Sequence, residues 1–284
     1  DERNGLTVAE TSLLAQDAHG FLWIGTIGGL YRFDGSEIRP WAPDKVRHVV
    51  QILSTGPTGE VVVAGDGEPL WEVTGMDVVP VPGPHGRDIL SWMDAAWSAD
   101  GALWVAGADT LWRRSPAGGW RSWSREQFDD RPFYRVRPVR GDSVFIATRT
   151  DLWIAAGQEP PRHLAAIPFV ISADRLDDRT MVVLSRTTGL WYVPPDSVRR
   201  APLLPEGAAD VAVREGTIWA SQGRGLYAIG PDGSTRRITP REGVPPGRPL
   251  LVDREGTLWI GGLRGLHGLP EPETVAWNAL DGLP

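Results

Sequence analysis

Short apolar runs alternate with turns rich in Gly, Pro and Asp along the whole chain. The N-terminal part shows the unit most clearly, with four runs rich in Val, Ile, Leu, Trp and Tyr at Ser12–Gln16, Leu22–Thr26, Leu30–Phe33 and Ile38–Trp41. Such short runs between turn residues are typical of β-strands, and no unit contains a helical stretch with a period of about 3.6 residues. The pattern therefore predicts an all-β protein built from four-stranded units.

The unit recurs along the chain. Each copy has an anchor residue in its second apolar run, and the anchors are Trp23, Val62, Trp104, Phe145, Val182, Trp219 and Trp259. A Leu followed by an aromatic residue or His stands seven or eight positions after each anchor, from Leu30-Tyr31 to Leu266-His267. A period of about 40 residues with four strands per unit is typical of a β-propeller. The sequence predicts a single domain over residues 1–284, a seven-bladed β-propeller with four antiparallel strands per blade.

Tryptophan is concentrated at the repeat positions. Eight of the 14 Trp residues stand at an anchor or in the following Leu-aromatic pair. A large flat ring fills the wedge between adjacent blades, and its burial stabilises the fold by roughly 1.5–3 kcal/mol. We therefore expect Trp23, Trp104, Trp219 and Trp259 to pack between blades rather than to bind a ligand. The two copies anchored at Val keep strand-forming residues, and we expect their wedges to be less well filled.

Charge and composition limit the function classes. The net charge of −7 and the pI near 5.3 argue against nucleic-acid binding and against docking on an acidic membrane surface. Cysteine is absent, which excludes disulfides and thiol chemistry and fits a bacterial periplasmic or extracellular protein. The chain has no apolar run long enough to span a bilayer. It begins at Asp1 without Met, and Asp281–Pro284 resembles the connector at Asn4–Thr7. We expect an excised piece that continues into a further domain.

Two copies carry a motif known from a repeat family. The segment Asp17–Gly35 reads DAHGFLWIGTIGGLYRFDG, and Asp253–Leu266 reads DREGTLWIGGLRGL. Both resemble the two-component regulator propeller repeat. In that family, propellers form periplasmic sensor regions of membrane-bound histidine kinases, diguanylate cyclases and related regulators, and many members carry two in tandem. Known ligands are often carbohydrates, although the repeat consensus is structural and transfers no binding residues. The resemblance implies a periplasmic, non-enzymatic sensor domain followed by a C-terminal signalling domain.

The candidate binding site is one mouth of the central channel, where the turns between second and third strands lie. Four consecutive blades place one Arg in this turn, namely Arg149, Arg186, Arg224 and Arg264. The planar donor fork of Arg suits carboxylate, sulfate or phosphate groups. Connectors between blades add Trp92, Phe133, Tyr134, Arg135 and Arg248 at the same mouth. We expect an anionic small molecule or oligosaccharide here, with Trp92 stacking on a sugar face. Alternatively, these Arg side chains are solvated or pair with acidic turns of blades two and three, and Trp92 plugs the channel.

No catalytic, cofactor or metal site is predicted. The five His residues show no metal-ligand spacing, and acidic residues such as Asp17, Asp34 and Asp253 stand in turns, where Asp accepts hydrogen bonds from local backbone donors. Two other functions remain open. One is a protein-interaction or homodimerisation platform that uses the same mouth. The other is a streptogramin-lyase-like enzyme, in which His48 and His85 on connectors of neighbouring blades converge.

Overall fold

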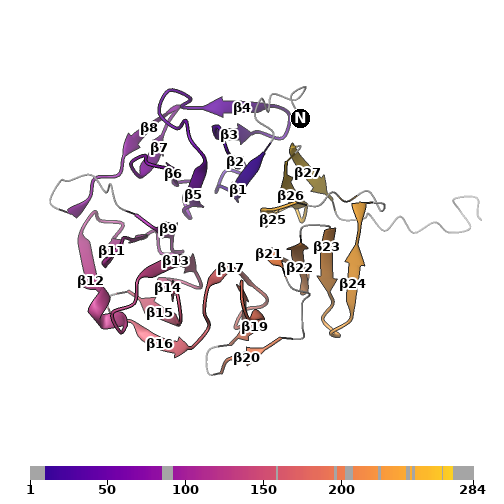
Figure 1. Cartoon of the computed structure of the whole chain (residues 1–284). Coiled ribbons are helices and arrows are strands. Elements are labelled where there is room, and N and C mark those ends of the chain that lie inside the picture. The colour runs from indigo at the N-terminus through magenta and orange to yellow at the C-terminus, as the bar shows by residue number, and fades with distance from the viewer. Residues whose placement is uncertain are drawn as a thin grey trace, which may run out of the picture.

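The fold is a ring of β-sheets around a central channel (Figure 1). The computed structural model describes residues 10–84, 92–157, 159–194, 197–201, 207–222, 225–240, 244, 247–263 and 265–270. These residues form six four-stranded antiparallel sheets and one sheet of three strands. The first strand of every sheet lies nearest the channel, and the following strands step outwards in chain order (Figure 1). The predicted seven-bladed β-propeller is confirmed.

The strands of each blade are consecutive in the chain. Blades 1 to 3 contain β1 (Thr11–Gln16), β2 (Leu22–Thr26), β3 (Gly29–Phe33) and β4 (Ile38–Trp41); β5 (Val50–Thr55), β6 (Val61–Gly65), β7 (Trp71–Thr74) and β8 (Asp77–Pro80); and β9 (Asp94–Trp97), β10 (Leu103–Ala106), β11 (Thr110–Arg114) and β12 (Trp120–Ser124). Blades 4 and 5 contain β13 (Phe133–Pro138), β14 (Ser143–Thr148), β15 (Leu152–Ala156) and β16 (Arg162–Ala165); and β17 (Val170–Arg175), β18 (Met181–Ser185), β19 (Gly189–Val193) and β20 (Arg199–Arg200). Blades 6 and 7 contain β21 (Ala208–Arg214), β22 (Thr217–Gln222), β23 (Gly225–Ile229) and β24 (Thr235–Ile238); and β25 (Leu250–Val252), β26 (Leu258–Gly262) and β27 (Gly265–Leu269). The outermost strand expected for blade 7 at residues 274–277 lies outside the described residues.

The strands predicted for blade 1 match the structure to within one residue at each end. The one-residue differences are at the starts of β1 and β3, where Thr11 pairs with Thr26 and Gly29 with the same Thr26. Thr26 thus joins all three inner strands at one end of the blade. The repeat pattern placed the strands well because apolar runs and turn residues act locally.

Anchor side chains pack into the wedge between their own blade and the next. Trp23 is 2% exposed and lies in a cluster with Val50 and Val63 of blade 2. Trp104 is fully buried against Phe133 and Ile146 of blade 4. These two Trp residues therefore pack between blades, as expected.

The wedges anchored at Val contain aromatic side chains from other positions. Beside Val62 the wedge contains Trp97, Trp112 and Trp120 of blade 3. Beside Val182 it contains Tyr192 of blade 5 and Tyr227 of blade 6. Aromatic side chains from other positions thus pack beside the missing anchor rings, which the sequence did not indicate, while poorer filling of these wedges stays a prediction.

An acidic turn residue holds the anchor Trp of blade 1. Asp17 Oδ1 accepts the backbone N–H groups of His19 and Phe21 at 2.9 and 3.1 Å. Its Oδ2 accepts Trp23 Nε1–H at 2.7 Å, inside the wedge. Blade 7 repeats the pair, with Trp259 Nε1 2.7 Å from Asp253 Oδ2. These residues therefore cap the turn, as predicted, and also fix the indole, which the sequence did not indicate.

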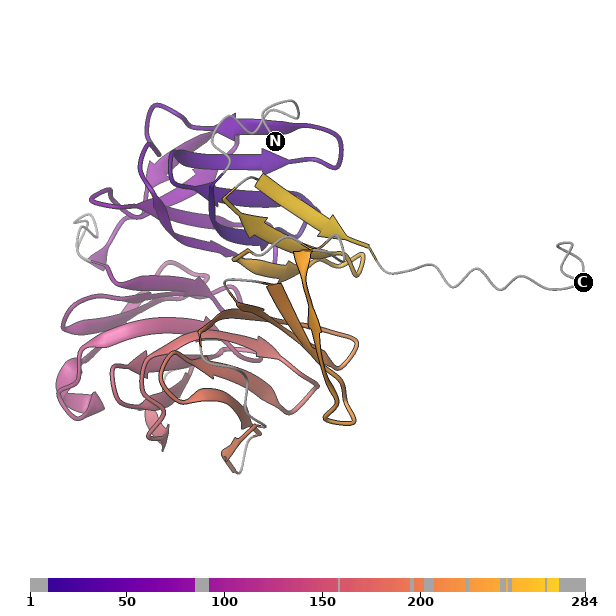
Figure 2. The same cartoon turned by 45° about the vertical axis from the view of Figure 1, so that its right-hand side comes forward.

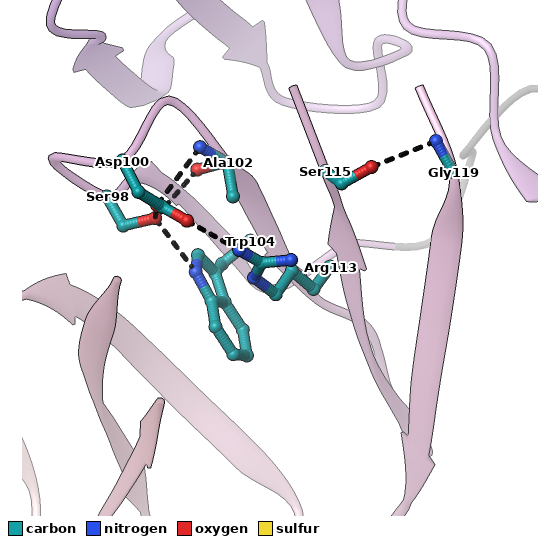
Figure 3. A network of polar contacts seen from close by, with 7 residues as sticks. All are labelled: Ser98, Asp100, Ala102, Trp104, Arg113, Ser115 and Gly119. Atoms are coloured by element: carbon teal, nitrogen blue, oxygen red, sulfur yellow. Dashed lines mark hydrogen bonds and ion pairs between the residues drawn. The ribbon is translucent and has the colours of Figure 1, made fainter. Parts of the chain in front are cut away.

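Blade 3 achieves the same result with different residues (Figure 3). Trp104 Nε1 donates to Ser98 Oγ at 3.1 Å, and Ser98 Oγ donates to Asp100 Oδ1 at 2.5 Å. Asp100 in turn pairs with Arg113 at 2.5 Å, and the Arg113 guanidinium lies 5.6 Å from the centroid of the Trp104 ring. The polar contacts of the indole are thus satisfied inside the wedge.

Blades 1 and 7 lie side by side and close the ring (Figure 2). Leu14 and Phe33 of blade 1 pack with Trp259 of blade 7, and the Phe33 and Trp259 ring centroids are 5.8 Å apart. Gln16 Nε2 also donates to Glu255 Oε2 at 2.9 Å. Among the described residues, closure therefore rests on packing and polar contacts between these blades.

Candidate functional site

The channel has two mouths, defined by the turns that surround them. The front mouth carries the turns between second and third strands and the connectors that lead into each first strand. The back mouth carries the turns between first and second strands. The strand registers place these turns at opposite ends, because the start of each first strand pairs with the end of the second. The predicted Arg turns therefore lie at the front.

Arg149 and Arg186 are neighbours at the front mouth. Phe169 joins them, because its backbone N–H donates to Arg149 O at 3.1 Å and its carbonyl accepts Arg186 N–H at 2.9 Å. Both Arg side chains are exposed. Neither forms an ion pair within the described part of the chain. Two exposed Arg residues thus lie on neighbouring turns that are joined through the backbone of Phe169.

Tyr134 and Arg135 extend this group towards the channel. Tyr134 is the extra residue of a β-bulge at the start of β13, and its ring meets Phe169 edge-on with centroids 6.4 Å apart. The Arg135 guanidinium lies over the Tyr134 ring at 4.9 Å. Arg135 Nε is buried and has no hydrogen-bond partner among the described residues. We call Tyr134, Arg135, Arg149, Phe169 and Arg186 the blade 4–5 cluster.

Phe169 is the member of this cluster that was not among the residues predicted from the sequence. Its φ is +48°, in the left-handed region that a bulky side chain rarely adopts. Such strain persists where surrounding contacts enforce it, and it concentrates at ligand sites. Phe169 immediately precedes a first strand, as Met93 does in blade 3, so its connector position was available as a signal.

The other predicted site residues that the structure describes, Trp92 and Arg248, lie outside this cluster. Trp92 is half-buried, donates from Nε1 to Glu68 O at 2.9 Å, and packs on the core between blades 2 and 3. It therefore has a packing role, which the sequence did not indicate. Arg248 is exposed just before β25 on blade 7. Arg224 and Arg264 lie outside the described residues, so their place at the mouth stays a prediction.

Glu68 and Asp109, in the acidic turns of blades 2 and 3, have partners of their own. Glu68 is 8% exposed, and its Oε1 lies 2.8 Å from both His48 Nδ1 and Arg47 N. Asp109 pairs with Arg125 at 2.7 Å. These carboxylates are therefore engaged elsewhere and do not neutralise Arg149 or Arg186. His85 lies outside the described residues, so its convergence with His48 stays untested.

Exposed apolar side chains form an apolar arc on four other blades of the front mouth. Ile27, Val49, Met93 and Leu263 are exposed by 43, 38, 43 and 76% respectively. They lie on blades 1, 2, 3 and 7, in second-to-third-strand turns or just before first strands. The front mouth is thus basic and aromatic on blades 4 and 5, and it carries exposed apolar side chains on blades 1, 2, 3 and 7, with the exposed Arg248 also on blade 7.

Below the mouth, the first strands of all seven blades line a cavity of about 250 Å³. Asp94 and Arg137 form an ion pair of 2.6 Å in its wall. Asp174 and Asp210 also line it, and removal from water raises the pKa of Asp174 to about 6 and also raises the pKa of Asp210. The channel wall therefore combines charged groups of both signs.

The three channel Asp residues also join neighbouring blades. Each accepts a backbone N–H from the first strand of the next blade: Val136 to Asp94 at 2.9 Å, Val213 to Asp174 at 2.6 Å, and Leu250 to Asp210 at 2.8 Å. These contacts give the carboxylates a structural role. Among the described residues, no group of three or more His, Cys, Asp or Glu is placed to hold a metal ion. Nor does this part of the chain contain a helix of the length and apolarity needed to cross a membrane.

Comparisons with known proteins give structural neighbours but no sequence match. No protein-family model and no curated protein matches the sequence. The chain is similar to the extracellular domain of the hybrid two-component system BT4673 from B. thetaiotaomicron, with a TM-score of 0.75 and 14% identity over 95% of this chain and 39% of that one. It is also similar to the extracellular domain of BT3049 from the same organism, with a TM-score of 0.74 and 15% identity over 94% of this chain and 40% of that one. Virginiamycin B lyase from Staphylococcus aureus has a TM-score of 0.71 and 11% identity, over 93% and 96% of the two chains. These similarities support the propeller fold. The chain spans about two fifths of the length of the two extracellular domains.

Proposed function

We propose that this propeller is the periplasmic ligand-sensing domain of a bacterial two-component-type receptor, and that it binds an anionic ligand such as an acidic sugar at the front mouth. The observation that carries the proposal is the blade 4–5 cluster, in which Arg149 and Arg186 are held side by side through a strained Phe169. The proposal is further supported by the repeat motif at Asp17–Gly35 and by the similarity to extracellular domains of two-component systems.

The chemistry of the cluster fits an acidic sugar. A carboxylate takes two parallel N–H donors from one guanidinium, and Arg149 and Arg186 are exposed and free of ion pairs within the described residues. The ring of Tyr134 lies beside them with the Arg135 guanidinium 4.9 Å from its centroid, and the buried Nε–H of Arg135 has no acceptor among the described residues. The protein carries a net charge of −7, so this group of Arg side chains is a local positive region on an acidic protein.

Signalling would follow from differential binding. A ligand shifts the balance between two receptor arrangements only when it binds one more tightly. Binding across the turns of blades 4 and 5 orders Arg149, Phe169 and Arg186 together, because backbone hydrogen bonds already join them. In this proposal, a C-terminal signalling domain of the same receptor reads the change.

The test is binding of acidic and neutral oligosaccharides to the chain, measured by calorimetry and thermal shift at low and high salt. We expect acidic sugars alone to bind and to raise the melting temperature by mass action, with an affinity that falls as salt is added. Arg149→Ala and Arg186→Ala should each weaken binding about tenfold or more, because a hydrogen bond to a charged group contributes about 1.5–3 kcal/mol. Arg39→Ala, on the outermost strand of blade 1, is the control. Affinities equal to wild type in both mouth variants would overturn the proposal.

A protein-interaction or dimerisation platform is the second candidate function. The exposed Ile27, Val49, Met93 and Leu263 on the same face favour it. Alanine scanning of the mouth separates the two functions, because a protein footprint extends over the apolar arc and a small ligand's footprint stays on the blade 4–5 cluster. Loss of self-association or of partner binding in Val49→Ala and Met93→Ala would support this second function.

A further inference from the structure

The back of blade 4 departs from the repeat. In blades 1 and 7 the first-to-second-strand turn places an Asp 2.7 Å from the anchor indole, and in blade 3 a Ser does so at 3.1 Å. Val139 is the corresponding turn residue of blade 4, because its N–H bonds to Ser143 O at 3.0 Å as Asp17 N–H bonds to Phe21 O. The anchor of blade 4 is Phe145. In blade 4, Val139 and Phe145 thus replace the hydrogen-bonded Asp and Trp of blades 1 and 7, and Phe has a smaller ring than Trp.

A cavity of about 260 Å³ lies at this place, between blades 4 and 5. Its apolar lining comes from both blades, through Phe145, Ile154, Leu164, Met181 and Val193. The wedges anchored at Val contain Trp or Tyr side chains from other positions. Trp191 of blade 5 packs against the cluster around Phe145, but no Trp or Tyr among the described residues lines this cavity.

Charged groups at the opening of the cavity are mostly positive. Arg140, Arg162, Arg175 and Arg179 line it, against Asp177 and Asp178. Asp177 is engaged locally, because it accepts the N–H groups of Arg179 and Thr180 at 2.7 Å, and these bonds hold its pKa below the ordinary value.

The second carboxylate is also occupied. Asp178 pairs with Arg175 at 2.8 Å. Arg140 reaches only the backbone carbonyl of Asp178, at 3.4 Å, and Arg162 is exposed without an ion-pair partner in the described part of the chain. Arg140 and Arg162 are therefore available to an incoming anion.

We propose that this pocket binds a small amphipathic anion, consisting of an aromatic ring or short acyl chain with one carboxylate. The apolar part lies against Phe145 and Met181, and the carboxylate meets Arg140 and Arg162. A cavity of about 150 Å³ holds a single benzene ring, so about 260 Å³ fits a ring with a short chain. An apolar lining with few convergent polar groups is the usual character of small-molecule sites. This site is separate from the front mouth, because it is built from the turns at the other end of the same strands.

The test uses benzoate, 3-phenylpropionate and indole-3-propionate as probes, with the corresponding primary amides as neutral controls. Binding is measured by calorimetry and by saturation-transfer NMR. We expect the carboxylates to bind and the amides to bind at least about tenfold more weakly, because the Arg side chains favour a charged partner. No binding of any carboxylate, or equal binding of the amides, would overturn the proposal.

Two sets of variants locate the site. The double variant Val139→Asp with Phe145→Trp restores the pair found in blades 1 and 7, fills the cavity and should abolish binding. Arg140→Gln and Arg162→Gln change only surface groups, and each should weaken the carboxylates about tenfold while leaving the amides unaffected. Circular dichroism checks the fold of each variant. Carboxylate affinities unchanged in these Gln variants would contradict the proposal even if the double variant failed to fold.

The two proposed sites are tested independently. Arg186→Ala at the front mouth should leave binding of the aromatic carboxylates unchanged. Conversely, Arg162→Gln should leave binding of acidic sugars unchanged. If one of the two sites fails its binding test, the result for the other site therefore still decides that other proposal.

Discussion

Replacing Asp17 with Ala tests whether the turn carboxylate holds the wedge of blade 1 together. Asp17 is 2% exposed and accepts three hydrogen bonds, from the backbone of His19 and Phe21 and from the indole of Trp23. Trp23 is also 2% exposed, so its N–H cannot turn to water when the acceptor is lost. A hydrogen bond to a charged group contributes about 1.5–3 kcal/mol, and an unsatisfied buried donor costs about 1–3 kcal/mol. We therefore expect Asp17→Ala to lower the free energy of unfolding by about 3 kcal/mol.

Thermal melting followed by circular dichroism measures this loss. Unfolding entropy is about 2.1 cal/mol/K per residue, so a chain of 284 residues gives about 0.6 kcal/mol/K. A loss of about 3 kcal/mol then lowers the melting temperature by about 5 °C. Asp17→Asn should fall between wild type and Asp17→Ala, because either orientation of the amide leaves at least one of the three donors unpaired.

Asp34→Ala is the matched control. Asp34 also caps local donors, since its Oδ1 accepts the N–H groups of Ser36 and Glu37 at 2.9 and 2.8 Å, and these bonds lower its pKa to about 2. Its carboxylate is exposed, so water replaces the lost contacts and the melting temperature should change little. A shift for Asp17→Ala no larger than that for Asp34→Ala would refute the wedge argument.

Two further predictions concern pH and backbone geometry. The pKa of Asp174 is about 6 in the fold against an ordinary 3.8, so the folded state binds this proton more tightly and the carboxyl's contribution to stability rises as pH falls from about 6 to about 4. Melting curves across that range should show wild type gaining stability relative to Asp174→Asn, and the opposite trend would contradict the assignment. Gly29→Ala should destabilise more than Gly20→Ala: both have positive φ, but only at Gly29 would a Cβ lie 2.6 Å from a backbone atom, Val46 O. Equal melting temperatures for the two variants would disprove this clash.

The sequence predicted the blades because their signals are local. Apolar runs, turn residues and the spacing of the anchors repeat in every copy, so the strand ends of blade 1 were placed to within one residue. The same regularity placed Arg149 and Arg186 in equivalent turns of adjacent blades. Their adjacency at one mouth follows from the ring, since equivalent turns of neighbouring blades must lie beside each other.

Contacts between residues that are far apart in the chain could not be predicted in this way. Phe169 joins Arg149 and Arg186 by backbone bonds that depend on how a connector enters the next blade. Trp92 stands outside the repeat marks, yet it packs between blades 2 and 3 and bonds to Glu68 O. Both roles depend on residues about 20 positions away in the chain, which only the ring brings together.

The sequence by itself determined the fold, the number of blades and the turns that surround each mouth, because these depend on local patterns repeated along one chain. The tertiary structure decided which charged groups among the described residues have no ion-pair partner and which wedge between blades contains a cavity. Arg162 and the apolar floor at Phe145 come from different strands, and Met181 comes from the neighbouring blade. A cavity is the volume that packing leaves unfilled, so it depends on every side chain around it and has no pattern in the sequence.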